Sequence, residues 1–132
     1  FLDVVEQPFW KAETLFDRAE AYLGLENLDN AKKCAEEGLE LRPKGRVNAE
    51  LRMILGDIAY SNKDYTAAAA YYVVVVQLFV DDKTLRSDAL FKSYNTLLKK
   101  GDVKEAKHYL ETLKKEFPDY LKEKKPPAEI GS

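Results

Sequence analysis

The 132-residue sequence is poor in the residues that define several protein classes. Cys34 is its only cysteine, so an intrachain disulfide is excluded. Five prolines and six glycines are too few for an all-β protein rich in loops. The formal net charge is only −2, which provides no general attraction to nucleic acids or anionic lipids. With a third of its residues charged and 45% hydrophobic, the composition is typical of a soluble globular protein.

Long hydrophobic runs are also rare, and the one exception is YTAAAAYYVVVVQLFV at residues 65–80. Thirteen of the fourteen residues from Ala67 to Val80 are apolar, and none is charged. The run is too short to span a membrane, since a spanning helix needs about 20 apolar residues. Valine and tyrosine favour β-strands, and periodicity alone does not distinguish a short buried strand from a buried helix. The neighbouring sequence has to decide between the two.

Three segments of similar pattern follow one another along the chain. They begin at Ala12, Ala49 and Ser87, and starts 37 and 38 residues apart are typical of stacked helix pairs. Each segment has an amphipathic first half, a polar break (LENLDNA, SNKDYTA or KKGDVKEA) and a second helical half. The apolar run falls in the second half of the middle segment. We therefore predict that it is a helix, because tertiary context overrides its strand propensity.

These segments resemble the tetratricopeptide repeat over residues 12–118. The family's large and small positions are matched in phase in all three segments, and its proline in the first and third. Ala35, Val75, Val80 and Tyr94 depart from the pattern. The long spacing and the EFPDY ending resemble the repeats of bacterial cell-envelope scaffold proteins. The matching residues are Leu15, Ala19, Tyr22, Ala31, Gly38 and Pro43; Leu55, Gly56, Tyr65, Ala68 and Tyr72; and Leu90, Leu97, Ala106, Leu110 and Pro118.

The resemblance implies an all-α fold, a right-handed α-solenoid of about three antiparallel helix pairs. The expected repeats are residues 12–48, 49–86 and 87–121. Residues 1–11 are expected to end a preceding element and lead into the first helix, with Pro8 as a candidate helix-start residue. Residues 122–132 are expected to form a flexible charged tail that contains prolines.

Local sequence supports the helix boundaries. Asn27, Asp64 and Asp102 stand where an N-cap satisfies the first free N–H groups of each second helix. Asp102 and Glu105 resemble a capping box. Pro43 and Pro118 are expected to follow helix ends, and Gly101 fits a tight turn between helices.

The resemblance also implies a concave groove formed by the first helix of each pair. Acidic residues above an apolar floor predict a protein or peptide partner with basic and large apolar side chains, and they disfavour nucleic acid. The alternative is that some of these residues pack against the next helix. The groove residues are Glu13, Phe16, Glu20 and Leu23; Glu50, Met53, Asp57 and Tyr60; and Asp88, Phe91, Asn95 and Leu98.

The outer face of the middle repeat is a second candidate surface. The first and third repeats carry charged residues at the corresponding positions, whereas the middle repeat carries Ala69, Ala70, Val73, Val74 and Gln77. A helix that is apolar nearly all round is normally buried. We therefore expect a second copy of the chain, a partner or an upstream region to cover this face, unless alanine and valine are simply tolerated at the surface.

The sequence offers no support for catalysis. Motifs for binding phosphate, dinucleotide, zinc or calcium are absent. The lone histidine, His108, is expected on a polar helix face, and Cys34 is expected to pack as a small residue two repeats away. We therefore predict a non-enzymatic scaffold or adaptor without a cofactor, a metal site or a membrane-inserted segment. The alternatives are a homo-oligomerisation module and an accessory domain of a larger bacterial envelope assembly, and both cytoplasm and cell envelope fit.

Overall fold

The computed structural model describes residues 2–123, with side chains for residues 12–122. Within this range every secondary-structure element is a helix, which confirms the predicted fold class. The apolar run at residues 65–80 is a helix and not a strand. The helices are α1 (Leu2–Gly24), α2 (Leu28–Glu40), α3 (Arg46–Ser61), α4 (Tyr65–Leu78), α5 (Lys83–Lys100), α6 (Val103–Glu116) and α7 (Tyr120–Glu123).

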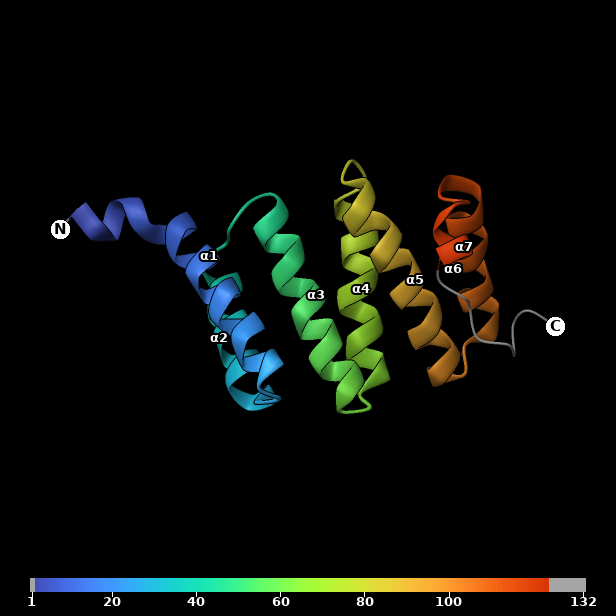
Figure 1. Cartoon of the computed structure of the whole chain (residues 1–132), viewed down its shortest axis with the longest axis horizontal. Coiled ribbons are helices and arrows are strands. Elements are labelled where there is room, and N and C mark those ends of the chain that lie inside the picture. The colour runs from blue at the N-terminus through green and yellow to red at the C-terminus, as the bar shows by residue number, and fades with distance from the viewer. Residues whose placement is uncertain (1, 124–132) are drawn as a thin grey trace.

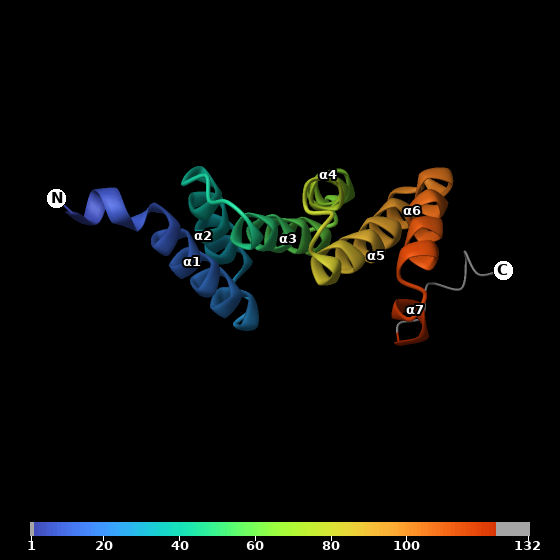
Figure 2. The same cartoon turned by 90° about the horizontal axis from the view of Figure 1, so that it is seen from above.

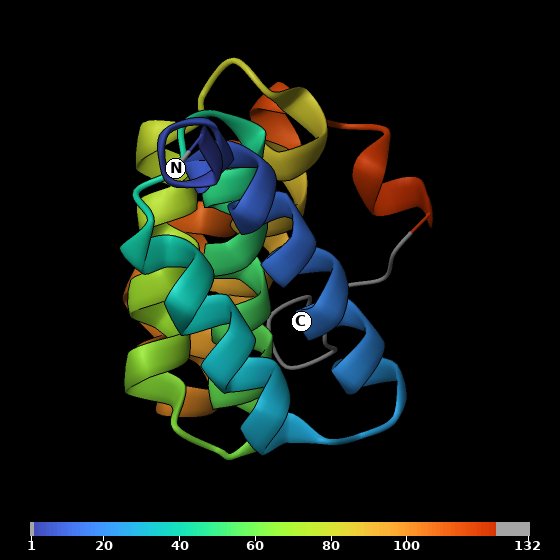
Figure 3. The same ribbon diagram turned by 90° about the vertical axis from the view of Figure 1, so that its left-hand side faces the viewer.

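The helices are stacked in chain order as a solenoid of helix pairs (Figure 1). α1 packs on α2, α3 on α4, and α5 on α6, while α2–α3 and α4–α5 contacts join successive pairs. α4 lies on one side of α3 and α5, and α7 lies on the opposite side (Figure 2). A view from the N-terminal end shows α7 outside the main stack (Figure 3). We call the side of α3 and α5 that α7 occupies the inner face.

The turn within each helix pair has the same backbone geometry. The residue before each predicted N-cap is left-handed, with φ of 60° at Glu26, 63° at Lys63 and 100° at Gly101. The next residue begins the helix: Asn27 accepts a hydrogen bond from the Asn30 amide, and Asp64 accepts one from the Ala67 amide. These two predicted N-caps are confirmed.

The predicted capping box at Asp102 is wrong. Asp102 occupies the N-cap position, but its side chain makes no capping hydrogen bond. Its carboxylate instead forms an ion pair with Lys100, with an N–O distance of 3.4 Å. Asp82 caps α5 by accepting from the Leu85 amide at 3.2 Å, a cap that the sequence analysis did not identify.

The described helices reach beyond the predicted repeats on both sides. α1 extends back to Leu2, so Pro8 lies inside this helix and not at its start. At the other end, Tyr120 begins the short helix α7, which reaches Glu123 and includes Lys122 of the predicted tail. The rest of the predicted tail, residues 124–132, lies outside the described residues.

Close packing between α3 and α4 sets the centre of the core. Gly56 lies against the ring of Tyr72, and a Cβ on Gly56 would be 2.5 Å from Tyr72 Cε1. The Tyr72 side chain is only 2% exposed and belongs to a core cluster with Ala68, Val75 and Leu90. The small residue that the repeat pattern requires at position 56 is therefore a consequence of this contact.

The solenoid itself covers most of α4. Ala68, Tyr72, Val75 and Val76 are buried, as the repeat pattern predicted. Ala69 corrects the prediction of an open outer face, because it is 7% exposed and packs with residues of α5 and α6. On another side of α4, Tyr71 packs against the cluster formed by α1, α2 and α3. A helix between two neighbouring pairs is contacted from several directions, which accounts for much of its apolar sequence.

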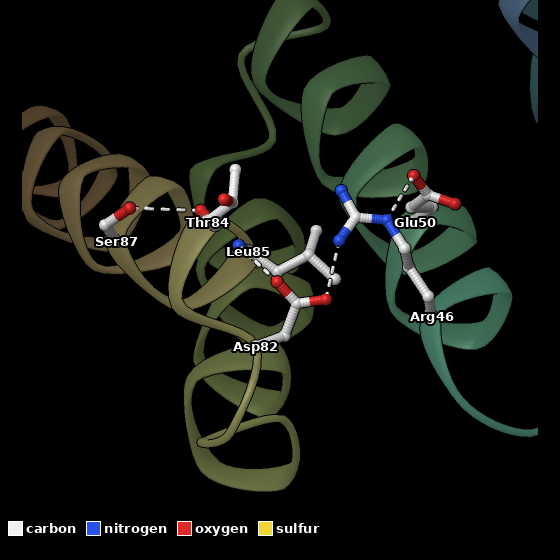
Figure 4. A network of polar contacts seen from close by, with 6 residues as sticks. All are labelled: Arg46, Glu50, Asp82, Thr84, Leu85 and Ser87. Atoms are coloured by element: carbon white, nitrogen blue, oxygen red, sulfur yellow. Dashed lines mark hydrogen bonds and ion pairs between the residues drawn. The ribbon is translucent and has the colours of Figure 1, made fainter.

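An ionic network fastens the connection between α4 and α5 to the start of α3 (Figure 4). Arg46 contacts Asp82 through Nη1 at 2.6 Å and Glu50 through Nε at 3.2 Å. Because Asp82 also caps α5, this carboxylate links the beginnings of two successive helix pairs.

Candidate functional site

A cleft opens on the inner face between α3 and α5. It has a volume of about 400 Å³ and is bordered by residues of α3, α4, α5 and α7. Successive helix pairs thus contribute to one site, as expected for a groove that crosses a helical repeat array. The lining residues are Asp57, Tyr60, Ser61, Tyr72, Phe91, Lys92, Asn95, Thr96 and Tyr120.

Aromatic rings form the walls of the cleft. Tyr60 packs edge-to-face with Tyr65, at a centroid distance of 5.3 Å. Phe91 packs against Tyr120 at 5.6 Å with the rings tilted by 56°. The Tyr120 hydroxyl donates a hydrogen bond of 2.7 Å to Asp88 Oδ1, which holds the start of α7 against α5. These contacts give the cleft an ordered apolar wall.

A polar network lies beside these rings. Lys92 Nζ donates to both oxygens of Asp57, at 2.8 and 3.0 Å, and Tyr72 Oη donates to Asp57 Oδ1. Lys92 Nζ also lies 5.8 Å from the centroid of the Tyr72 ring. Burial raises the pKa of Tyr72 well above its ordinary value, and the negative charge of Asp57 adds to this effect. The central carboxylate therefore has a cationic partner and a neutral phenol donor.

Two polar groups at the cleft have no hydrogen-bond partner among the described residues. They are Asn95 Oδ1 and Thr96 Oγ1, and both atoms are buried. Thr96 is fully buried as a residue. A buried acceptor without a donor costs about 1–3 kcal/mol, so these groups favour an occupant that brings a hydrogen bond.

The structure brings four of the predicted groove residues together in this cleft, namely Asp57, Tyr60, Phe91 and Asn95. Met53 is a correction: it was predicted on the groove surface, but it is 8% exposed and belongs to the core between α3 and α5. Met53 packs against residues of the next helix pair, and it therefore belongs to the core and does not line the groove.

The other predicted groove residues lie outside the cleft. Glu50 is held by Arg46, and Asp88 accepts the hydrogen bond of Tyr120. Phe16 and Leu23 on α1 are half-buried against the first core cluster, and Leu98 packs against the last one. Glu13 and Glu20 are exposed on α1.

Sequence reasoning missed five residues of the cleft: Ser61, Tyr72, Lys92, Thr96 and Tyr120. The repeat pattern places Tyr72 in the core, and Lys92 and Thr96 each directly follow a predicted groove residue in the sequence. Tyr120 belongs to EFPDY, at the end of the third repeat. The position of Lys92 directly after Phe91 is the one feature of the sequence that could have placed it near the groove. Its pairing with Asp57, 35 residues away, could not be predicted from the sequence.

The outer face of α4 remains uncharged where it reaches the surface. Ala70 and Gln77 are exposed, and Val73 and Val74 are half-buried. Leu78, one turn beyond Val74, is 63% exposed. The uncharged outer surface is narrower than predicted because Ala69 is buried. It extends further toward the end of α4 because Leu78 is exposed.

The described residues contain neither a cluster of metal ligands nor a helix that could cross a membrane. No group of three or more histidine, cysteine, aspartate or glutamate side chains in this part of the chain is placed to hold a metal ion. None of its helices has the length and hydropathy of a membrane span. His108 is exposed, as predicted, and Cys34 packs half-buried against the first core cluster.

Comparison with known proteins agrees with the repeat architecture. A family model described as tetratricopeptide repeat matches residues 16–79, and a second model with the same description matches residues 88–120. Together the matches cover most of the chain. No curated protein matches the chain significantly. The cell-envelope subtype and the three repeat boundaries stay predictions.

Proposed function

The chain belongs to the tetratricopeptide repeat family, and on this premise we propose that it is a scaffold or adaptor whose inner face holds a segment of a partner protein. Repeats of this family generally mediate protein–protein interaction and are generally non-catalytic. One observation carries the assignment of the site: inner-face residues of two successive helix pairs converge on a single cleft with aromatic walls.

The charges suggest how a partner segment lies along this face. Glu13 and Glu20 are exposed on α1 and favour basic side chains at that end of the groove. At the cleft itself, Lys92 pairs with Asp57, so the acidic character expected there is largely neutralised. The partner segment is therefore basic toward α1 and apolar at the cleft.

Site-specific photo-crosslinking tests this function. A photoreactive amino acid is introduced at Tyr60 in the cleft or, as a matched control, at exposed His108 on α6. We expect Tyr60 to capture a protein partner that His108 does not, and Phe91→Ala to reduce this capture. Equal capture from both positions, or capture from His108 alone, would contradict the inner-face assignment.

A second candidate function is self-association through the outer face of α4. The exposed Leu78 and the uncharged surface from Ala70 to Gln77 favour it. Light scattering tests it: if the chain is a dimer, Leu78→Lys together with Ala70→Glu should yield monomers. A monomeric wild-type chain excludes this function. As a control, the same pair of substitutions should leave crosslinking from Tyr60 unchanged.

A further inference from the structure

We propose that the cleft between α3 and α5 receives a neutral aromatic side chain with a hydrogen-bond donor at its edge, a tryptophan or a tyrosine of the partner segment. This inference rests on the proposed function and narrows it from a groove to one side-chain class. Three properties of the cleft carry it: its charge balance, its aromatic walls and its unpartnered polar groups.

The charge balance disfavours an ionic occupant. Asp57 and Lys92 both border the cleft, and both Asp57 oxygens accept from Lys92 Nζ, at 2.8 and 3.0 Å. A lysine or arginine side chain would meet the Lys92 ammonium, and a carboxylate would meet Asp57. Either would have to compete for a partner that is already engaged. A neutral side chain leaves the pair intact.

The walls favour a planar apolar body. Tyr60, Phe91 and Tyr120 come from three different helices and expose their rings to the same space. Aromatic rings gain energy beyond simple burial when a further ring packs edge-to-face or offset against them. The volume of about 400 Å³ leaves room for a large side chain and part of its backbone.

The unpartnered groups add the requirement for a donor. Asn95 Oδ1 accepts only, and Thr96 Oγ1 both donates and accepts. A tryptophan indole N–H or a tyrosine hydroxyl reaching these atoms would restore a missing hydrogen bond, whereas phenylalanine would leave both groups buried and unpaired. Discrimination between these rings therefore reports directly on the proposed contact.

Titrations of the isotope-labelled full chain test the proposal by NMR. The probes are the N-acetyl amides of tryptophan, tyrosine, phenylalanine and lysine. We expect the tryptophan and tyrosine probes to shift the Asn95 side-chain amide and to bind about tenfold more tightly than the phenylalanine probe. Phenylalanine binding equally well, lysine binding most tightly, or unchanged resonances at Tyr60, Phe91 and Asn95 would each overturn it.

Two variants locate the donor contact. Asn95→Leu and Thr96→Val each remove one unpartnered polar group at little change in volume. The variant that loses the contacted group is expected to bring the tryptophan and phenylalanine affinities to within about threefold of one another. Thr66→Val, on the exposed surface of α4, is the matched control and should keep the wild-type preference. If both cleft variants keep that preference, the proposed contact is wrong; the wild-type titrations decide the case if a variant fails to fold.

The outcome is separable from that of the proposed function. If the probes bind as expected but Tyr60 captures no protein, the side-chain specificity stands and the scaffold assignment fails. If Tyr60 captures a partner that tryptophan and tyrosine probes do not displace, the scaffold assignment stands and the aromatic occupant is wrong.

Discussion

The ring of Tyr72 packs so closely on Gly56 that the two residues determine how near α3 and α4 lie. A Cβ on Gly56 would be 2.5 Å from Tyr72 Cε1, a distance that real Cβ contacts do not reach. The same tyrosine donates its hydroxyl hydrogen bond to Asp57, next to Gly56 in the sequence. The packing of the core and the geometry of the cleft are therefore coupled through one side chain.

Gly56→Ala tests this coupling. We expect the added methyl group to lower the free energy of unfolding by about 1–3 kcal/mol, the usual cost of overpacking a core. Gly24→Ala is the control, since a Cβ there has no neighbour within 4 Å and alanine favours the helix. Chemical denaturation measures both. Equal stabilities of the two variants would show that the α3–α4 contact is looser than described.

Tyr72→Phe removes the hydroxyl and keeps the ring. At neutral pH we expect the free energy of unfolding to fall by about 1 kcal/mol, because Asp57 loses one of its hydrogen-bond donors. Equilibrium denaturation at neutral pH measures this loss. A variant as stable as the wild type would show that the hydroxyl contributes nothing.

The same variant should alter the response to alkaline pH. Burial raises the Tyr72 pKa above its ordinary 10.0. Above pH 10 the unfolded chain therefore releases the phenol proton while the folded chain keeps it, so this stabilisation is lost as pH rises. Stability of the wild type should decline more steeply above pH 10 than that of Tyr72→Phe. Parallel pH profiles would contradict the raised pKa.

The Arg86–Glu116 pair predicts a dependence on acid pH. Arg86 donates to both Glu116 oxygens, at 2.8 and 3.0 Å, and these hydrogen bonds lower the pKa of Glu116 below its ordinary 4.5. A lowered pKa gives stability that is present above pH 4.5 and is lost as pH falls through the folded-state value. Because the Glu116 side chain is 38% exposed, we expect at most about 1 kcal/mol.

Glu116→Gln removes this ionisation and should flatten the fall in stability below pH 4.5, measured by thermal unfolding across pH. Arg86→Lys should be the more destabilising change at neutral pH, because Arg86 also donates to the Val76 carbonyl at 2.7 Å. If the stability of Glu116→Gln falls below pH 4.5 as steeply as that of the wild type, the Arg86–Glu116 pair is not the source of this pH dependence.

Asp82 combines a cap and an ion pair, and two substitutions separate them. Asp82→Asn keeps a capping oxygen for the Leu85 amide but loses the charge that contacts Arg46. We expect it to cost under about 1 kcal/mol, as is usual for an exposed pair. Asp82→Ala removes both and should cost about 1–2 kcal/mol. If the two variants unfold at the same denaturant concentration, the side chain does not cap α5.

Much of the fold was predictable because it depends on local chemistry and on the repeat itself. The polar breaks, the caps at Asn27 and Asp64 and the turn glycine Gly101 correctly placed the ends of helices. The repeat pattern also identified the apolar run as a helix and assigned Ala68, Tyr72, Val75 and Val76 to the core. The capping box at Asp102 failed: the Asp102 carboxylate lies beside Lys100 and makes no capping hydrogen bond to the helix.

The candidate site was predictable only in part. From their positions in the repeats, Asp57, Tyr60, Phe91 and Asn95 were predicted to line one groove. The structure places them around one cleft. The sequence did not reveal that Met53 faces the core, because a helix position does not state how closely the next pair packs. Nor did it reveal the role of Tyr120, which depends on where α7 meets α5.

The sequence by itself determined that this protein is a stack of helix pairs, since periodicity, caps and small residues act within or between adjacent segments. Only the tertiary structure decided the character of its surfaces. The burial of Ala69 depends on α5 and α6, and the neutralisation of Asp57 depends on Lys92, 35 residues away. Exposure and charge pairing arise from contacts between segments distant in the chain. The pattern of residues within one helix does not predict such contacts.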